Sequence, residues 1–228
     1  APVKTKQENE KAAKAAPVEK TAAVQPKGAM EIRRLEPNVL TLDYMDVAAG
    51  GETRKSAYFY QANQFAFQTN GMDRNPWDSA VQFKDELIRK KFPAESGLEA
   101  TYRFTIEGEV PKPLWIVIER PDLYKVTCNG KPVVAAKNSW WLDRAFGKID
   151  ITAAARPGPN AVTIKAQPFS IYHEIEPAYV LGDFSLRPAE KGFVMVPPEP
   201  LALQKGAGWN RQGMPFYAAG VAYGRKFD

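Results

Sequence analysis

Cysteine and histidine are nearly absent from this chain of 228 residues, which has one of each, Cys128 and His173. A single cysteine cannot close a disulfide within the chain, so nothing in the sequence requires an oxidising compartment. One histidine and one cysteine cannot supply the ligand sets of the common zinc sites. We therefore expect no cofactor, and only a structural calcium ion bound by oxygen ligands stays open among metals.

The surroundings of these two residues favour structural roles. Cys128 ends a strand-like run, where a lone cysteine behaves as a small buried apolar residue. His173 stands between Tyr172 and Glu174 and is expected to be packed and hydrogen-bonded rather than to act as a general base.

Long apolar runs are also missing. No stretch of about 18 apolar residues occurs, so we predict no transmembrane helix. The start lacks the basic, apolar and small-residue regions of a signal peptide, so none is expected. Because the first residue is Ala1 rather than methionine, we expect a processed chain or a piece of a longer protein.

The net charge of +5 is concentrated in the first 29 residues, which hold six lysines and three glutamates. The rest has a net charge of only +2 and no cluster of basic residues such as phosphate binding requires. We therefore expect no nucleic-acid partner. The segment 1–29 also lacks aromatic residues and is rich in Ala, Lys, Glu and Pro, which predicts a disordered linker or tail.

From residue 30 onward, apolar residues alternate with polar ones in short runs separated by Gly, Pro and Asn. This pattern predicts strands, at 39–45, 57–68, 101–107, 114–119, 124–128 and 160–166. In the first run Leu40, Leu42 and Tyr44 are expected on one face. The continuous apolar run 114–119 is expected to be covered on both faces. The sequence therefore predicts an all-β fold, an antiparallel β-sandwich.

One segment, DSAVQFKDELIRKKF at 78–92, has helical spacing, with Asp78 or Ser79 as N-cap and Pro93 closing it. We predict one short helix there. Beyond residue 187 the chain is rich in proline. We expect the sandwich to span 30–187, and 188–228 to be an extended segment with terminal strands. These strands either pair back into the sandwich or begin a further β domain.

Four turn and strand motifs occur in a fixed order, Asn129-Gly130, Trp140-Trp141, Asp150-Ile151-Thr152 and Gly158-Pro159-Asn160. Asn-Gly favours a type I′ hairpin turn, and Asp, Thr and Asn side chains bond nearby backbone amides. In this order, the motifs resemble the galactose-binding-like jelly-roll domain of large bacterial glycoside hydrolases, as in the sugar-binding domain of the β-galactosidase and β-glucuronidase family. The resemblance covers about residues 100–187. It implies a jelly-roll fold and a location in the periplasm or outside the cell.

Sugars are bound by aromatic faces beside polar side chains. Three stretches have this chemistry and supply the candidate ligand-binding residues, Trp140, Trp141, Asp143 and Arg144 in one, Trp77 in the second and Trp209 in the third. The structural alternative is that one of Trp140 and Trp141 packs in the core and the other under a loop, and that Trp77 and Trp209 anchor their loops.

Catalysis finds little support in the sequence. Glycoside hydrolysis needs two carboxylates roughly 5–10 Å apart, and the candidates by residue type are Glu119, Asp143, Glu174, Glu176 and Asp183. Glu174 and Glu176 would share one side of a strand, which is typical of a solvated or Arg-paired face. No nucleophile elbow, P-loop or dinucleotide fingerprint is present.

The sequence therefore favours a non-catalytic carbohydrate-binding or accessory module of a larger glycoside hydrolase. Its partners would be a glycan and a catalytic domain of the same or a longer polypeptide. One alternative is a structural or protein-interaction sandwich without a sugar site, which buried tryptophans would favour. The other is a glycosidase with paired carboxylates, which two partly buried carboxylates in a cleft would favour.

Overall fold

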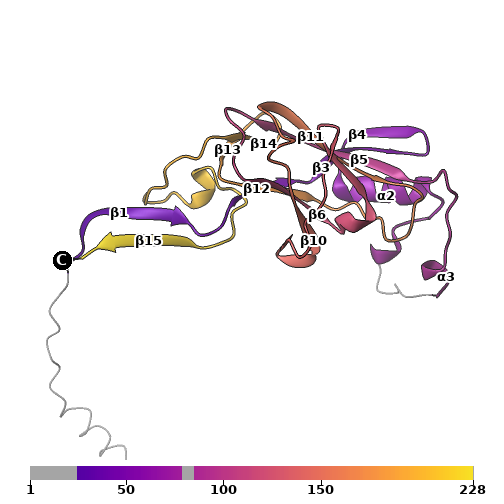
Figure 1. Ribbon diagram of the computed structural model, residues 1–228, viewed down its shortest axis with the longest axis horizontal. Coiled ribbons are helices and arrows are strands. Elements are labelled where there is room, and N and C mark those ends of the chain that lie inside the picture. Colours follow the sequence, from indigo (N-terminus) through magenta and orange to yellow (C-terminus); the bar gives the residue numbers. More distant parts are fainter. Residues whose placement is uncertain (1–24, 79–84, 228) are drawn as a thin grey trace, which may run out of the picture. The chain divides into compact units, whose positions relative to one another are not determined.

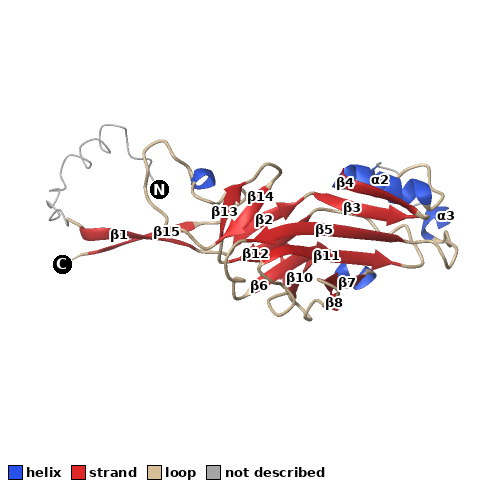
Figure 2. Ribbon diagram, turned by 90° about the horizontal axis from the view of Figure 1, so that it is seen from above, coloured by secondary structure: helices blue, strands red, loops and turns tan. Residues whose placement is uncertain are grey.

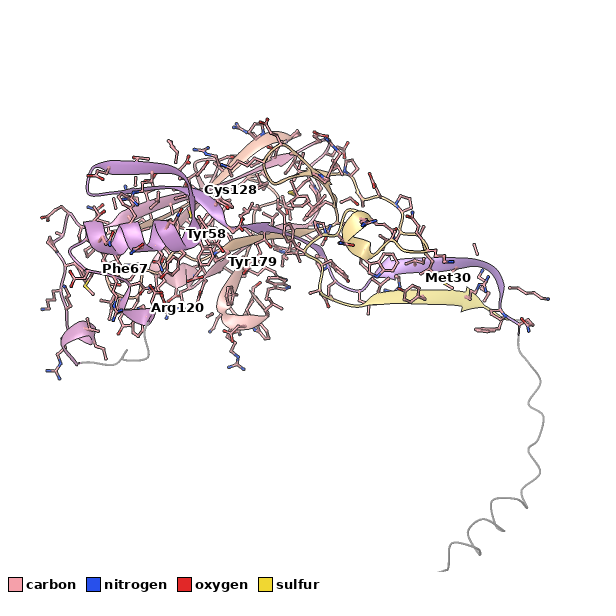
Figure 3. The ribbon with its side chains drawn as sticks, turned by 180° about the vertical axis from the view of Figure 1, so that it is seen from behind. Met30, Tyr58, Phe67, Arg120, Cys128 and Tyr179 are labelled. Carbon is pink, nitrogen blue, oxygen red and sulfur yellow. The ribbon has the colours of Figure 1, made fainter. Side chains whose placement is uncertain are left out.

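The computed structural model describes residues 25–78 and 85–227. They form two compact units, of which the larger is Arg33–Val221 and the smaller holds the residues up to Ile32 and from Ala222 onward. A two-stranded sheet joins β1 (Lys27–Arg34) to β15 (Val221–Lys226), and Met30 of β1 is labelled in Figure 3. Most of the predicted linker, residues 1–24, lies outside the described residues, and 27–29 belong to β1.

The larger unit is a sandwich of two sheets (Figures 1 and 2). The five-stranded sheet has the order β2 (Asn38–Leu42), β12 (Ala178–Gly182), β6 (Leu114–Glu119), β10 (Asp143–Asp150) and β9 (Trp140–Trp141). The eight-stranded sheet has the order β13 (Ser185–Pro188), β14 (Phe193–Val196), β5 (Leu98–Ile106), β11 (Gly158–Ala166), β7 (Lys125–Cys128) and β8 (Lys131–Pro132), with β3 (Tyr44–Ala49) and β4 (Glu52–Tyr58) paired beside β5. The prediction of an all-β antiparallel sandwich is confirmed.

The predicted alternation places the core correctly. On β5, Tyr102, Phe104 and Ile106 are all buried, and they face the apolar side chains of the other sheet in one hydrophobic cluster. In β6, Ile116 faces that core and Val117 is buried on the outer face. The run 114–119 is therefore covered on both faces, as expected.

The run 57–68 is a helix from Phe59 onward rather than the predicted strand, and only Ala57 and Tyr58 belong to a strand, β4. Helix α2 (Phe59–Thr69) buries Ala62, Asn63, Ala66 and Phe67, while the glutamines between them are exposed. This spacing has the period of a helix, and the two-residue step from Phe65 to Phe67 imitates a strand only locally. The helix packs against β3 and β4 (Figure 2).

The run 39–45 is not one strand. The chain leaves the five-stranded sheet after Leu42 and enters the eight-stranded sheet at Tyr44. Leu40 and Leu42 are buried as predicted, whereas Tyr44 is 50% exposed. The reason is that Asp43 interrupts the pairing where the chain crosses between sheets, and its carbonyl accepts a hydrogen bond from the Phe59 amide at 2.8 Å.

The helix predicted at 78–92 ends at Ile88 and does not continue to Pro93. A 3₁₀ turn, η1 (Pro76–Asp78), precedes it, and α3 (Asp85–Ile88) is helical. Residues 79–84 of the prediction lie outside the described residues. Two further 3₁₀ turns are η2 (Pro121–Leu123) and η3 (Trp209–Arg211).

The strands of the C-terminal segment 188–228 pair in two different sheets. Strand β14 pairs in parallel with β5 through Met195 and Ile106, and Met195 is fully buried in the main core. Strand β15 pairs with β1 instead. Residues 193–196 therefore belong to the sandwich.

The turn motifs have the geometry that their residues predict. Asn129 and Gly130 have φ of 50° and 79° and join β7 to β8 as a two-residue hairpin. Cys128, just before this turn, is fully buried, and its burial raises the pKa of the thiol to about 11. The Thr152 amide donates to Asp150 Oδ1 at 2.8 Å.

Asn160 joins the hairpin to the start of β11. Its Oδ1 accepts from the Arg156 amide at 2.9 Å and from Asn129 Nδ2 at 2.8 Å. Its Nδ2 donates to the carbonyls of Arg156 and Gly158. Asn160 is 3% exposed, so water cannot replace these partners.

We predict that Asn160→Ala lowers the free energy of unfolding by about 2–3 kcal/mol, because it leaves several buried polar groups without partners. Urea denaturation of both proteins measures the difference. The matched control is Gln64→Ala, which removes an exposed amide of α2 and should change stability by less than about 0.5 kcal/mol. Equal stability of the two variants would contradict the role given to Asn160.

Candidate functional site

A hollow of about 220 Å³ opens beside the end of β6. Its lining comes from three separate parts of the chain, and consists of Trp77, Glu119, Arg120, Tyr124, Tyr172 and Glu174. We call it the Trp77 hollow. It combines aromatic rings with two carboxylates and one guanidinium, and Arg120 is labelled in Figure 3.

Trp77 and Tyr172 form the aromatic part of this hollow. Their rings are stacked, with centroids 5.9 Å apart and an interplanar angle of 26°. The indole Nε1–H of Trp77 donates to the Ile171 carbonyl at 2.5 Å, which fixes the ring beside its partner. Tyr172 is 44% exposed, so the pair presents an aromatic surface to solvent.

Asn75 positions both an aromatic and an acidic member of the site. Its Oδ1 accepts from the Trp77 amide at 3.0 Å, and its Nδ2 donates to Glu174 Oε1 at 2.7 Å. The residue is 1% exposed. A buried amide with partners on both sides cannot rotate without losing hydrogen bonds, so it holds Trp77 and Glu174 in a fixed relation.

Three carboxyl groups gather here. Burial raises the pKa of Glu119, and the charge of Asp143 adds to the effect. Burial also raises the pKa of Glu174, with contributions from Glu119 and Asp78. For Glu176, burial together with the charges of Glu119 and Glu174 raises the pKa to about 7.

The expectation of a solvated or Arg-paired face for Glu174 and Glu176 is wrong. Both side chains are half-buried. The polar partner of Glu174 is the Asn75 amide, and within residues 25–78 and 85–227 no ion pair joins either glutamate to a basic side chain. The burial of Glu174 and Glu176 depends on β6 and on Asn75, which lie close to this segment in the fold. Because both are distant in sequence, no local pattern predicts this burial.

His173 packs against Tyr124, which lines the hollow. This is the packed, hydrogen-bonded histidine that the sequence predicted. The Ser170 amide donates to Nδ1 at 2.8 Å, so the proton resides on Nε2, which lies 3.1 Å from the Leu123 carbonyl oxygen. Burial lowers the pKa of the imidazole. Both nitrogens are thus engaged within the fold, and the ring packs against Tyr124 at 5.3 Å.

A second hollow, of about 580 Å³, shares Arg120 with the first. Trp140 and Arg144 contribute to its lining, and Trp140 is 48% exposed. We call it the Trp140 hollow. The Arg120 guanidinium donates through Nε and Nη2 to Asp122 at 2.9 and 2.8 Å. The two hollows therefore share the Arg120 side chain, whose guanidinium is held in place by Asp122.

The sequence candidates divide between these hollows and other places. Trp77, Trp140 and Arg144 line them. Asp143, the first residue of β10, lines neither hollow, and its Oδ1 accepts from the Ala145 amide at 2.8 Å. Trp141 instead packs on the outer face of the five-stranded sheet, with its ring centroid 5.2 Å from that of Tyr179. Trp209 lies in η3 and lines neither hollow.

Three further residues of the site, Tyr172, Tyr124 and Arg120, were not candidates. Tyr172 differs from other surface tyrosines only by its contact with Trp77, which is distant in sequence. Arg120 takes a left-handed conformation with φ of 45°, which an arginine rarely adopts. No local sequence pattern predicts the contact of Tyr172 with Trp77 or the left-handed conformation of Arg120.

The described residues contain no group of three or more His, Cys, Asp or Glu side chains that could hold a metal ion. None of the helices in the described part of the chain has the length and apolar character that crossing a membrane would take.

No protein-family model matches the chain, and no curated protein matches it. Among solved structures, it is similar to the β-glucuronidase from Ruminococcus gnavus in complex with C6-substituted uronic isofagomine, with 14% identity and a TM-score of 0.32. That match covers 72% of this chain and 32% of the enzyme. The FMN-binding β-glucuronidase from Facaelibacterium prausnitzii L2-6 has 10% identity and a TM-score of 0.30, with 76% and 29% covered. The chain thus spans about a third of the length of these enzymes.

We predict that Glu176 makes the protein less stable as pH rises. A carboxyl with a raised pKa in the folded state carries no penalty below its unfolded pKa of 4.5, and the penalty is complete above about 7. As pH rises through this window, the free energy of unfolding of Glu176→Gln should increase relative to that of the native chain by about 1–2 kcal/mol, after allowance for solvent screening.

Urea denaturation between about pH 4 and pH 8 measures this gain. Glu190→Gln, which neutralises an exposed carboxylate, serves as control and should keep the pH slope of the native chain. A Glu176→Gln variant with an unchanged slope would show that Glu176 ionises in the folded protein as it does in water.

Proposed function

We propose that this chain is a non-catalytic sugar-binding module of a larger glycoside hydrolase, and that it binds a glycan across the Trp77 and Trp140 hollows. The observation that carries the proposal is the stacked pair of Trp77 and Tyr172, partly exposed beside Glu119, Glu174 and Arg120. Aromatic faces pack on the C–H surface of a sugar ring, and the polar groups beside them bond its hydroxyls.

The order of the turn motifs supports the same proposal, because it resembles the sugar-binding domain of the β-galactosidase and β-glucuronidase family. A module of this kind would lie beside a catalytic domain of the same or a longer polypeptide, in the periplasm or outside the cell. The alternative, a structural or protein-interaction sandwich without a sugar site, would be favoured by buried tryptophans, and the exposure of Trp140 speaks against it.

We predict that Tyr172→Ala weakens glycan binding about tenfold, because it removes one of two stacked rings, which corresponds to about 1.4 kcal/mol. The measurement is a titration with oligosaccharides from xylan, pectin and peptidoglycan, followed by tryptophan fluorescence and calorimetry. Trp140→Ala tests the second hollow in the same way.

The matched control is Tyr60→Ala, which removes an equally exposed tyrosine from α2 (51% against 44%). Its affinity should equal that of the native chain. If no oligosaccharide binds the native chain, or if both tyrosine variants bind alike, the Trp77 hollow is not a sugar site and the structural alternative gains.

A second candidate function has one observation in its favour. Glu119 and Glu174 both line the Trp77 hollow with raised pKa values, and glycosidases keep one carboxylic acid protonated in this way. A catalytic site would need the second carboxylate to act as nucleophile or base in the same hollow.

Because the hydrogen bond from Asn75 and the stacked rings favour binding, we predict no hydrolysis of 4-nitrophenyl glycosides by the native chain. Release of 4-nitrophenol is followed by absorbance between about pH 4 and pH 8, the range in which these groups titrate. Glu119→Gln is the control for contaminating activity. Hydrolysis that is present in the native chain and absent in Glu119→Gln would replace the binding function by catalysis.

A further inference from the structure

A third hollow lies where the chain crosses between the two sheets. It encloses about 390 Å³, and its lining includes Asp43, Tyr44, Asp46, Arg103, Lys191 and Phe216. We call it the Tyr44 hollow. None of its lining residues belongs to the Trp77 or Trp140 hollow, so it is a separate place on the larger unit.

Aromatic rings from three segments form its apolar walls. Tyr44, at the start of β3, is 50% exposed, and its ring is braced by Tyr58 with centroids 5.4 Å apart. On another wall, Phe193 and Phe216 meet edge to face at 5.2 Å. Phe216 is 37% exposed. Exposed rings that are already fixed by neighbours lose little freedom when a ligand packs on them.

The polar side of the hollow is rigid as well. The Asp46 carboxylate accepts from Arg103 through Nε and Nη2 at 3.0 and 2.9 Å, and from the Ser56 amide at 3.0 Å. Ser56 has φ of 48°, and the pairing of β3 with β4 shifts register beside it. Irregular strand pairs of this kind often aim side chains at functional sites.

The charges of the lining cancel. Asp43 and Asp46 are balanced by Arg103 and Lys191, and Asp46 is engaged by Arg103 and Lys55. The lining therefore has no net charge, and the Lys191 amine lies over the Tyr44 ring, 5.7 Å from its centroid. A lining without net charge favours a neutral ligand, because it offers no net charge in exchange for the lost hydration of a charged one.

The volume is also within the range of small-molecule sites, about 300–1,000 Å³. Aromatic walls, a polar floor and balanced charge are the chemistry that recognises an uncharged sugar ring. We propose that the Tyr44 hollow is a second, independent saccharide site of this chain, which binds one neutral pyranose ring between Tyr44 and Phe216. The site goes beyond the proposed function, since it would exist even if the Trp77 hollow bound nothing.

The test is a titration of the isotope-labelled chain with methyl β-D-glucopyranoside and methyl β-D-galactopyranoside, followed by amide NMR shifts. We expect saturable shifts at the amides of Ser56 and Gly192, which line the Tyr44 hollow. Tyr44→Ala and Phe216→Ala should each weaken binding at these amides about tenfold. The corresponding uronic acids should bind no more tightly than the neutral glycosides.

Two controls separate this site from the first. Tyr60→Ala should leave the shifts at Ser56 and Gly192 unchanged, and so should Tyr172→Ala, which alters only the Trp77 hollow. If Tyr44→Ala fails to fold, Phe216→Ala carries the test alone. The proposal is overturned if these amides do not shift at saturating sugar, if they shift equally in Phe216→Ala, or if only the uronic acids bind.

Discussion

The side-chain amide of Asn75 is the interaction on which the arrangement of the site depends. It is buried, and it bonds the Trp77 backbone on one side and the Glu174 carboxylate on the other. Asn75 and Glu174 are 99 residues apart in the sequence. The Asn75 amide therefore fixes Trp77 relative to Glu174, although the two residues are not joined by strand pairing. The Glu174 carboxylate can stay half-buried because this donor offsets part of its lost hydration.

The strands and tight turns follow from the sequence because they depend on neighbours along the chain. Alternation predicted strands at 101–107 and 160–166, which are β5 and β11, and Asn129-Gly130 predicted a hairpin whose two residues need positive φ. Helix α2 was missed because Phe65 and Phe67 alternate as strand residues do, although the exposed glutamines around them have helical spacing. Tyr44 was misplaced because Asp43 carries the chain from one sheet to the other, which is decided by the partners of each strand.

The candidate site could be predicted only in part, for the same reason. Trp77, Trp140 and Arg144 were identified by their chemistry, since an aromatic ring beside polar residues is visible locally. Tyr172 and Arg120 were not, because what distinguishes them is a contact made across the fold. Trp141 has the same chemistry as Trp140, but the pleat of β9 turns it toward Tyr179. The two tryptophans are chemically identical, and they differ in their surroundings because successive side chains of a strand point to opposite faces.

The fully buried Cys128 makes the protein its own reporter of sheet opening. It is the sole cysteine of the chain, and it lies on β7 opposite Val162 of β11. A thiol reagent can react with Cys128 only after these strands separate, because the side chain has no exposed surface. The rate of labelling would therefore report the opening of one strand pair, β7 and β11, whereas tryptophan fluorescence averages over five residues.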